Sequence, residues 1–300
     1  MDDNEAKGNQ YRKEAEGKLK SRGFLSRLTG SSRNVEEAIN SYEKAGNCFK
    51  MAKVWKDAGD VFVLAADLYL QSDVKHEAAS KYVEAANCYR KVNPAEAIKN
   101  LFKSIDIYTE SGKFTMAAKY HITAGEIYEV DMADVEKSSD QYQKAADYYL
   151  GEQSTSQANK CLLKVAEFAM QLEQFDNAIQ IYDQVGKKSM ENKLLQYGAK
   201  EYFFKSVICM LCLDMINGQK GIKKYEDLYP SFTDSREYKL LKQLIGCLES
   251  QNPDGYSAAV QEYDSISRIE PKIIKLLLKI KKLYLHVEEQ PVQIEDGDVN

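Results

Sequence analysis

Proline and glycine are scarce in this chain, with only 5 and 16 copies among 300 residues. Because turn-rich β-proteins and flexible linkers use both residues heavily, this scarcity argues against an all-β or a disordered chain and favours a helix-rich one. The sequence also has no run of about 18 apolar residues, the length that a membrane-spanning helix needs. Its first residues, Met1 to Glu5, are acidic and polar and lack the apolar centre of a signal peptide. We therefore expect a cytoplasmic protein.

The chain also has no excess of positive charge: it contains 41 Lys and Arg and 46 Asp and Glu, which gives a formal net charge of −5. Proteins that bind nucleic acid usually carry a basic domain, so we expect no nucleic acid as a partner. The three histidines, His76, His121 and His286, have no motif relation to one another. There is no glycine-rich phosphate loop, paired-acid motif or nucleophile elbow. The chain is therefore expected not to be an enzyme.

The six cysteines all lie inside helical patterns, where small core residues are typical. Cys209 and Cys212 have the spacing of a metal or redox pair, but they lie in an apolar helix with no second pair and no histidine nearby. We expect neither a metal site nor another cofactor. Metal- or thiol-dependent catalysis at this pair remains one alternative function.

An internal repeat is what the sequence does contain. The stretch SYEKAGNCF at 41–49 recurs as KYVEAANCY at 81–89 and as QYQKAADYY at 141–149. Each copy has an aromatic residue near its start, small residues at its centre and an aromatic residue at its end, all on one helix face that a neighbour can approach closely. One helix cannot bury such a stripe, whereas stacked helices can. The repeat therefore predicts a helical solenoid.

Start and stop signals divide the repeat into antiparallel hairpins with a period of about 40 residues. The first repeat helix is expected to start at Asn34-x-x-Glu37, a variant of the capping box. Asn93-Pro94 supplies an N-cap followed by a proline at the first helical position. Three glycines fall where helices should end: Gly112, Gly151 and Gly186. The predicted helices span 5–20, 34–50, 54–71, 75–91, 94–111, 114–130, 133–149, 154–170 and 174–186.

After residue 193 the pattern changes to a longer apolar helix that includes 202–215 and a short helix near 220–228. Further helices are predicted to start at Asp234-x-x-Glu237, Asn252-Pro253 and Glu270-Pro271. The expected fold is all-α: a right-handed superhelix of antiparallel helical hairpins, similar to tetratricopeptide (TPR) repeats, with a C-terminal helical bundle. The expected domains are hairpins at 1–190 with a membrane-contacting loop at 22–33, a bundle at 191–287 and an acidic mobile tail at 288–300.

A lysine recurs once per hairpin, at intervals of 38, 41 and 40 residues: Lys81, Lys119, Lys160 and Lys200. Alternate helices of a solenoid share one face, so these lysines would form a basic stripe. Lys164 and Lys113 would extend it. Such a stripe suits an elongated acidic partner, and salt would weaken its binding. The alternative is an ordinary solvated helix face.

Three apolar residues lie between arginines in the segment after the first predicted helix: Phe24, Leu25 and Leu28, with Arg22, Arg27 and Arg33 around them. Their combination suggests contact with an anionic membrane surface. Alternatively, Phe24 and Leu25 cap the first hairpin.

The predicted last helix, 271–284, is basic on one side and apolar on the other. Its apolar side can dock on the preceding helix, which we favour, or lie on a membrane. The basic arc holds Lys272, Lys275, Lys279 and Lys282, opposite Ile273, Leu277, Ile280 and Tyr284.

Several blocks of sequence carry a family resemblance: FKMAK at 49–53, KFTMAAK at 113–119, NKCLLKVA at 159–166, AKEYFFK at 199–205, DSRE at 234–237 and EYDSISR at 262–268. In these blocks the chain resembles the soluble N-ethylmaleimide-sensitive factor (NSF) attachment proteins, or SNAPs, of the alpha/beta type, which are Sec17-like SNARE-disassembly adaptors. The resemblance runs from about residue 5 to 285. It implies a twisted sheet of helical hairpins capped by a helical bundle.

The resemblance also implies a function in vesicle-mediated transport and membrane fusion. Family members coat the assembled SNARE complex, a four-helix bundle of the syntaxin/SNAP-25/synaptobrevin type, and recruit the hexameric AAA ATPase NSF, which pulls the bundle apart. The chain would then be a cytoplasmic monomer when free, peripherally associated with membranes. The residues matching the family's SNARE contacts are Lys113, Lys119, Lys160, Lys164 and Lys200, and Lys81 belongs to the same stripe. The family's membrane-contacting loop matches Phe24, Leu25 and Leu28.

In the family, NSF engages acidic positions of the C-terminal bundle together with the extreme C-terminus. Asp214 and Glu249 match such positions, whereas Gly246 and Ser250 stand where acids are usual. Val299 takes the place of the family's next-to-last leucine, a departure from the family pattern in the segment that engages the ATPase. The alternative function is a helical-repeat scaffold that binds peptide or chaperone tails and has no link to fusion.

Overall fold

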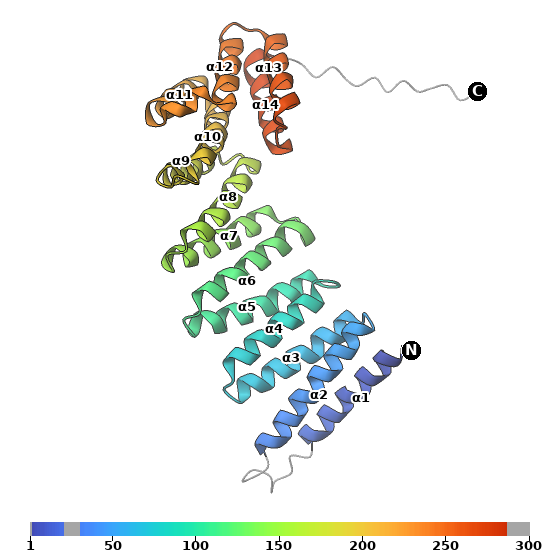
Figure 1. Ribbon diagram of the computed structural model, residues 1–300. Coiled ribbons are helices and arrows are strands. Elements are labelled where there is room, and N and C mark those ends of the chain that lie inside the picture. Colours follow the sequence, from blue (N-terminus) through green and yellow to red (C-terminus); the bar gives the residue numbers. More distant parts are fainter. Residues whose placement is uncertain (1, 21–30, 287–300) are drawn as a thin grey trace, which may run out of the picture. The chain divides into compact units, whose positions relative to one another are not determined.

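The computed structural model describes residues 2–20 and 31–286, and within these ranges it contains helices and no β-strand (Figure 1). The all-α fold class is thus confirmed. The chain divides into two compact units, Met1–Lys164 and Val165–Asn300, which we describe separately. The division falls within helix α8 (Thr155–Gln171), and the boundary expected near residue 190 stays a prediction.

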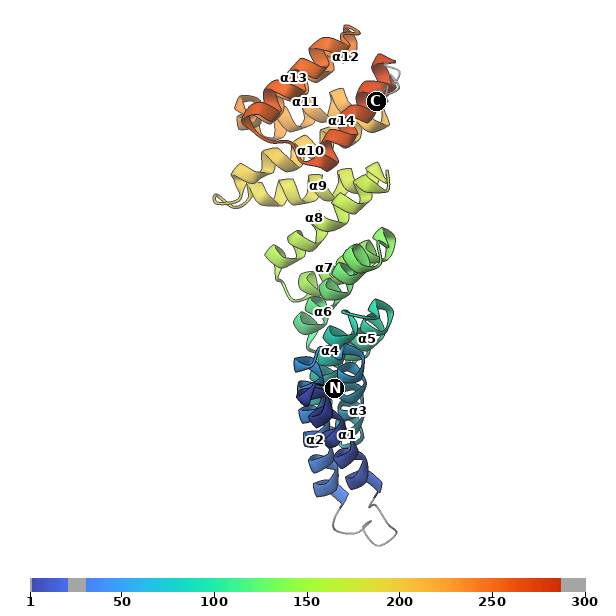
Figure 2. The same ribbon diagram turned by 90° about the vertical axis from the view of Figure 1, so that its right-hand side faces the viewer.

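The first unit is a series of antiparallel helices in which each helix from α1 to α6 packs against the next one along the chain (Figures 1 and 2). The start and stop signals predicted most of their bounds to within three residues. Its helices up to α8 are α1 (Asp3–Lys20), α2 (Ser31–Met51), α3 (Trp55–Gln71), α4 (Lys75–Tyr89), α5 (Pro94–Glu110), α6 (Phe114–Glu126), the π-helical turn η1 (Ile127–Asp131) and α7 (Val135–Gly151).

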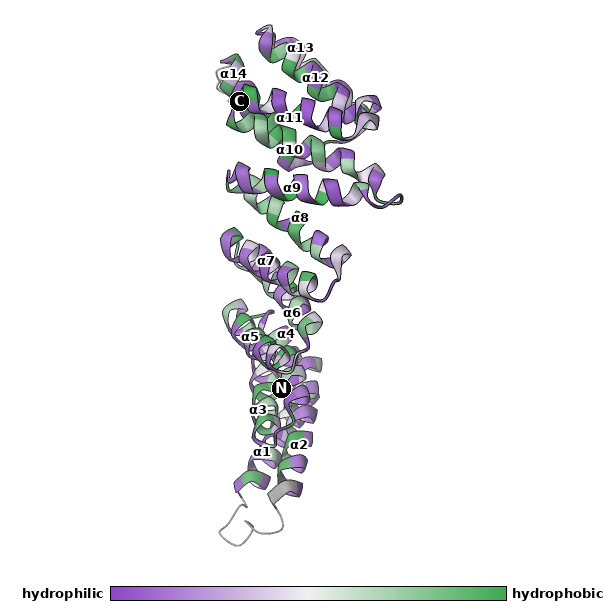
Figure 3. Ribbon diagram, turned by 90° about the vertical axis from the view of Figure 1, so that its left-hand side faces the viewer, coloured by the Kyte–Doolittle hydropathy of each residue, from purple (hydrophilic) through white to green (hydrophobic). Residues whose placement is uncertain are grey.

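Small residues and aromatic rings meet where these helices cross. Ala45, Ala85 and Ala145, from the centres of the three repeat copies, are fully buried. A Cβ added to Gly46 on α2 would lie 2.6 Å from the ring of Phe62 on α3, so this ring occupies the space that a side chain would take. Hydrophobic and hydrophilic residues alternate along most of the helices (Figure 3), as expected where one side of a helix is buried. The repeat stretch is therefore a packing element.

Most links between the helices are three or four residues long and contain one residue in the left-handed region. These residues are Lys53, Asp73, Gly112, Ala133, Gln153 and Glu173, with φ between 53° and 67°. A left-handed residue after the last helical turn is the common way to end a helix, and glycine is the usual choice. Because five of these six positions are not glycine, Gly112 is the one left-handed residue that a glycine signal indicated; Gly151, also expected at a helix end, is the last residue of α7.

The second unit is a bundle around the apolar helix α10 (Ala199–Leu213), which packs against its neighbours α9, α11, α12 and α14. Phe203, Val207 and Leu211 of α10 are fully buried. The other elements are α9 (Phe175–Met190), η2 (Gln196–Gly198), α11 (Met215–Leu228), η3 (Pro230–Asp234), α12 (Arg236–Glu249), α13 (Pro253–Ile266) and α14 (Pro271–Leu285).

Three predicted helix signals were wrong. Asn34 lies inside α2, where Glu37 forms an ion pair with Arg33 at 3.1 Å instead of closing a capping box. The N-cap of α12 is Ser235, whose hydroxyl accepts from the backbone N–H of Tyr238, and not Asp234. Gly186 lies inside α9, because its role is close approach: an added Cβ would lie 2.5 Å from the ring of Phe203.

Helix α14 docks its apolar side within the bundle. Ile273, Leu277 and Ile280 are buried, and the helix packs against α10, α12 and α13. On its basic side, Lys272 pairs with Glu167 at 3.0 Å, and Lys279 pairs with Glu173. Docking on neighbouring helices, rather than exposure of the apolar side, is therefore what the structure shows.

Candidate functional site

Lys119 and Lys160 occupy equivalent positions on alternate helices of the first unit. Lys119 directly follows the buried residues Ala117 and Ala118 of α6, and Lys160 follows Ala158 of α8 at the same interval of 41 residues. Both lysines are exposed, and within the described ranges Lys160 has no hydrogen bond or ion pair. The Lys119 ammonium lies 5.7 Å from the ring centroid of Tyr120. These two cations are available to a partner.

Lys113 is exposed at the N-cap of α6, six residues before Lys119. Its ammonium lies 3.2 Å from Nδ1 of His76 on α4. Lys164, one turn after Lys160, forms an ion pair with Glu129 at 3.2 Å. The first unit thus carries lysines of both α6 and α8, and among them Lys164 already pairs with a glutamate of the same unit.

Lys81 and Lys200, like Lys164, each have a glutamate partner within their unit. Lys119 directly follows the buried Ala118, whereas Lys81 lies two positions after the equivalent buried residue, Ala79. This difference of one residue rotates the side chain of Lys81 around α4 toward α2. There it pairs with Glu43 at 2.8 Å, and only 19% of its side chain is exposed. Lys200 pairs with Glu237 at 3.2 Å. Sequence spacing alone did not reveal these pairings.

An exposed apolar cluster lies between α9 and α10, close in sequence to Lys200. Leu194 is 87% exposed and Tyr197 is 72% exposed, with Leu195 beside them. Exposed large apolar groups of this kind often mark contact surfaces. Sequence analysis missed the cluster, although three large apolar residues next to Lys193, between two helices, were a readable signal.

Asp214 and Glu249 lie at one end of the second unit, both against helix α11. The carboxylate of Asp214 caps α11 by accepting from the backbone N–H of Asn217 at 2.6 Å. Glu249, at the end of α12, accepts from the side-chain amide of Gln219 on α11 at 2.6 Å. Both acids are exposed. The structure therefore gathers the two predicted acidic positions.

The last turn of α14 reaches the same end of this unit. The hydroxyl of Tyr284 donates to the carbonyl of Leu211 at 2.9 Å, and the amide of Gln251 donates to the carbonyl of Tyr284 at 3.2 Å. Burial, and to a smaller extent the charge of Asp214, raises the pKa of the Tyr284 phenol. The last described residues of α14 thus lie at the same end of the unit as the two acids.

Phe24, Leu25 and Leu28 lie outside the described residues. Among helices within 2–20 and 31–286, none combines the length and apolar character that crossing a bilayer requires. In the same ranges no group of three or more His, Cys, Asp or Glu side chains is placed to hold a metal ion. Burial raises the pKa of the Cys212 thiol to about 12, so this group stays protonated and unreactive near neutral pH.

Comparison with known proteins extends over nearly the whole described chain. Residues 6–284 match the family model described as soluble NSF attachment protein, SNAP. The chain is 52% identical to the alpha-soluble NSF attachment protein of Mus musculus, covering 92% of this chain and 94% of that one. It is 50% identical to the beta-soluble NSF attachment protein of Bos taurus, covering 91% and 92%.

A more distant relative is the vesicular-fusion protein SEC17 of Komagataella phaffii, which is 34% identical and covers 86% of this chain and 89% of its own. The matched residues cover the helices that carry the lysines and those that carry Asp214 and Glu249. The chain belongs to the soluble NSF attachment protein family.

Proposed function

We propose that this chain is an adaptor that binds assembled SNARE complexes and recruits and stimulates the ATPase NSF for their disassembly. The observation that carries the proposal is the similarity to NSF attachment proteins along almost the full length of the chain. The two partners require two separate surfaces. The lysines of α6 and α8 supply one, and the acidic end of the second unit supplies the other.

The lysine surface supports an electrostatic contact with an acidic helical bundle. Lys113, Lys119 and Lys160 are exposed, and their charges add in front of the same partner. Lys164 and Lys200 contribute once they exchange their glutamate partners for the SNARE bundle. Lys81 is expected to contribute least, because its side chain is mostly covered and already paired.

Charge reversal of Lys119 and Lys160 tests this surface. The double variant Lys119→Glu, Lys160→Glu removes two attractions and adds two repulsions of about 0.5 kcal/mol each, so SNARE binding should weaken roughly 30-fold. Co-sedimentation with SNARE bundles at low and high salt measures the effect. The matched control is Lys144→Glu, an exposed lysine on α7, which should bind normally. Unchanged binding of the double variant would favour a peptide-binding scaffold unrelated to fusion.

The acidic end of the second unit supports ATPase recruitment. Asp214 and Glu249 are exposed carboxylates that their hydrogen bonds hold in place, so a basic partner meets charges whose positions are already fixed. Near Glu249, Gly246 on α12 and Ser250 directly after it carry no charge. We therefore expect a weaker electrostatic contact than in family members with acids there.

The segment with Phe24, Leu25 and Leu28 is the proposed membrane contact. Burying such side chains fully contributes about 1.5–3 kcal/mol each, and interfacial burial is partial, so one adaptor would be anchored weakly. Several adaptors on one SNARE bundle would strengthen the contact by raising the effective concentration.

The variant Phe24→Ser, Leu25→Ser tests this contact. It should slow the disassembly of SNARE complexes anchored in liposomes and leave the disassembly of soluble complexes unchanged. Disassembly assays on both substrates provide the measurement. Equal loss in the two assays would show that the segment acts other than through the membrane.

A further inference from the structure

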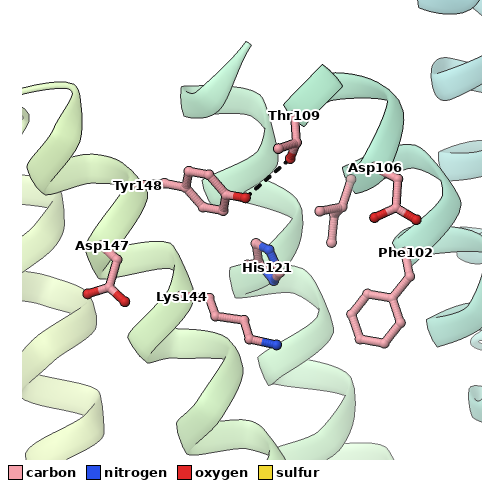
Figure 4. A pocket seen from close by; sticks show the side chains of 8 residues that line it. Phe102, Asp106, Thr109, His121, Lys144, Asp147 and Tyr148 are labelled. Carbon is pink, nitrogen blue, oxygen red and sulfur yellow. Dashed lines mark hydrogen bonds between the residues drawn. The ribbon is translucent and has the colours of Figure 1, made fainter. Parts of the chain in front are cut away.

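A cavity of about 790 Å³ opens in the first unit between α5 and α7, with α6 behind it (Figure 4). Asp106 and Phe102 come from α5, His121 from α6, and Lys144 and Tyr148 from α7. His121 lies two residues after Lys119, about 200° around the helix. The cavity therefore faces away from the lysine surface and is separate from the proposed SNARE contact.

The preceding hairpin shows what the same position holds when it is filled. The buried residues Ala78, Ala79 and Ala85 of α4 recur 39 residues later as Ala117, Ala118 and Ala124 of α6. At the same interval Tyr82 corresponds to His121, and Asp67 of α3 corresponds to Asp106 of α5. Leu101 and Tyr142 are buried equivalents on α5 and α7, separated by 41 residues, so Lys103 corresponds to Lys144.

Tyr82 is held at this position by a carboxylate and a cation. Its hydroxyl donates to the carboxylate of Asp67, and the ammonium of Lys103 lies 4.7 Å from its ring centroid. The side chain is 98% buried, with 2% of its surface exposed. At this position the protein itself supplies the phenol that contacts both the carboxylate and the lysine.

In the next hairpin the carboxylate and the lysine are present, but the phenol is replaced by a smaller imidazole. His121 is turned toward α7, where its Nδ1 lies 2.8 Å from Oε1 of Gln141 and its ring stacks on Tyr148 at 5.6 Å. Within the ranges that the structure describes, Asp106 and Lys144 have no hydrogen bond or ion pair. The two groups that hold Tyr82 in one hairpin thus face an open cavity in the other.

We propose that this cavity binds a tyrosine side chain presented by a peptide segment of a partner protein. The phenol donates to Asp106, and the ammonium of Lys144 lies over the ring, as Asp67 and Lys103 hold Tyr82. Phenylalanine binds more weakly, because it leaves the carboxylate of Asp106 without a donor when the peptide displaces water. Phosphotyrosine is excluded, because its negative charge would face the same carboxylate.

Peptide titrations of the full chain, followed by NMR, test the proposal. The probes are three capped tripeptides, acetyl-Gly-X-Gly-amide, in which X is tyrosine, phenylalanine or phosphotyrosine. The tyrosine peptide should shift the imidazole signals of His121 and the ring signals of Tyr148 saturably. The phenylalanine peptide should bind about tenfold more weakly, a factor that a hydrogen bond to a charged group supplies. The phosphotyrosine peptide should cause no shift.

Two variants and one matched control locate the binding. His121→Tyr supplies the chain's own phenol, as in Tyr82, and should abolish binding of the tyrosine peptide while SNARE co-sedimentation stays unchanged. Asp106→Asn removes the charged acceptor with little change in shape and should reduce the preference for tyrosine to less than about threefold. Asp67→Asn, at the filled position, should leave the peptide affinity as it is.

Equal affinities for the tyrosine and phenylalanine peptides would overturn the proposal, as would unchanged binding in a folded His121→Tyr protein. If His121→Tyr does not fold, the preference measured with Asp106→Asn decides. Because SNARE binding is measured on the same variants, failure of this proposal is distinguishable from failure of the proposed function.

Discussion

Several buried polar residues in this protein are held by partners on a neighbouring element or on their own helix. His121 pairs with Gln141 across α6 and α7, and the hydroxyl of Ser138 donates to the carbonyl of Gly125 at 2.9 Å. Lys205, with 9% of its side chain exposed, pairs with both Glu201 and Glu270 at 3.0 Å. Such pairs reduce the cost of burying polar groups. Where the buried group titrates, as His121 does, its protonation is also linked to the stability of the fold.

The stability of the first unit should depend on pH through His121. Burial is the main cause that lowers its pKa below the ordinary value of 6.5. As the pH falls, His121 therefore takes up a proton near pH 6.5 in the unfolded chain and only at a lower pH in the folded chain. The stability present above pH 6.5 is lost as the pH falls through this value toward the lower folded pKa, with a slope of up to about 1.4 kcal/mol per pH unit.

Denaturant unfolding at pH 7.5, 6.5 and 5.5 measures this slope. Trp55, the single tryptophan of the chain, lies on α3 and reports the unfolding of the first unit by fluorescence. His121→Tyr should remove the contribution of His121. The control His76→Gln changes an exposed residue, keeps His121 and should keep the slope that His121 causes. The same slope in His121→Tyr would contradict the assignment.

Helix pairs are joined by close approach between a glycine on one helix and an aromatic ring on the next. Gly46 meets Phe62, Gly125 meets the ring of Tyr142, and Gly186 meets Phe203. The first two pairs lie in the first unit and the third in the second unit, so both units use the same device. A glycine weakens its own helix by about 0.5–1 kcal/mol relative to alanine. The packing of the ring outweighs this local cost.

Alanine substitution separates the local effect from the packing effect. Gly46→Ala should destabilise the first unit by about 1–3 kcal/mol, because the added methyl group overlaps the buried ring of Phe62, which cannot move without disturbing the core. In the matched variant Gly17→Ala, nothing lies within 4 Å of the added methyl group on α1. That variant should be neutral or stabilised by up to about 1 kcal/mol. Both are measured by Trp55 fluorescence, and equal effects would rule out the close-approach explanation.

On the scale of the whole molecule, an adaptor has to engage two partners without one contact replacing the other. The exposed lysines of α6 and α8 belong to the first unit, and Asp214 and Glu249 belong to the second. The two surfaces differ in the sign of their charge as well as in their place along the chain. Variants should therefore separate the two activities.

The double variant Asp214→Asn, Glu249→Gln is designed to remove charge and keep structure. Asparagine caps a helix about as well as aspartate, and glutamine still accepts from Gln219. SNARE co-sedimentation should be unchanged, whereas recruitment of NSF to the SNARE complex should fall about three- to tenfold, as expected for the loss of two exposed charge contacts. Recruitment is measured by pull-down with and without SNARE complex. Loss of SNARE binding in this variant would show that the two surfaces are not independent.

The sequence by itself determined the helices, the packing repeat and the family. The signals for them are local properties of the chain: apolar periodicity, the prolines at the start of α5, α13 and α14, and the small residues of 41–49. Each signal can be read from the sequence without knowing where the neighbouring helix lies. The end of α9 depended on packing, because Gly186 serves close approach to Phe203, and the left-handed residues that are not glycine carried no local signal.

Only the tertiary structure decided which side chains are accessible. Lys81 and Lys119 each recur once per hairpin, but Lys81 lies one position later relative to the buried alanines of its helix and so packs against Glu43, whereas Lys119 stays exposed. Tyr82 and His121 have the same position relative to the buried alanines, but only the packed hairpins show that one side chain fills its site and the other leaves a cavity. The physical reason is that exposure and pairing depend on groups from other helices, which the periodicity of a single helix does not contain.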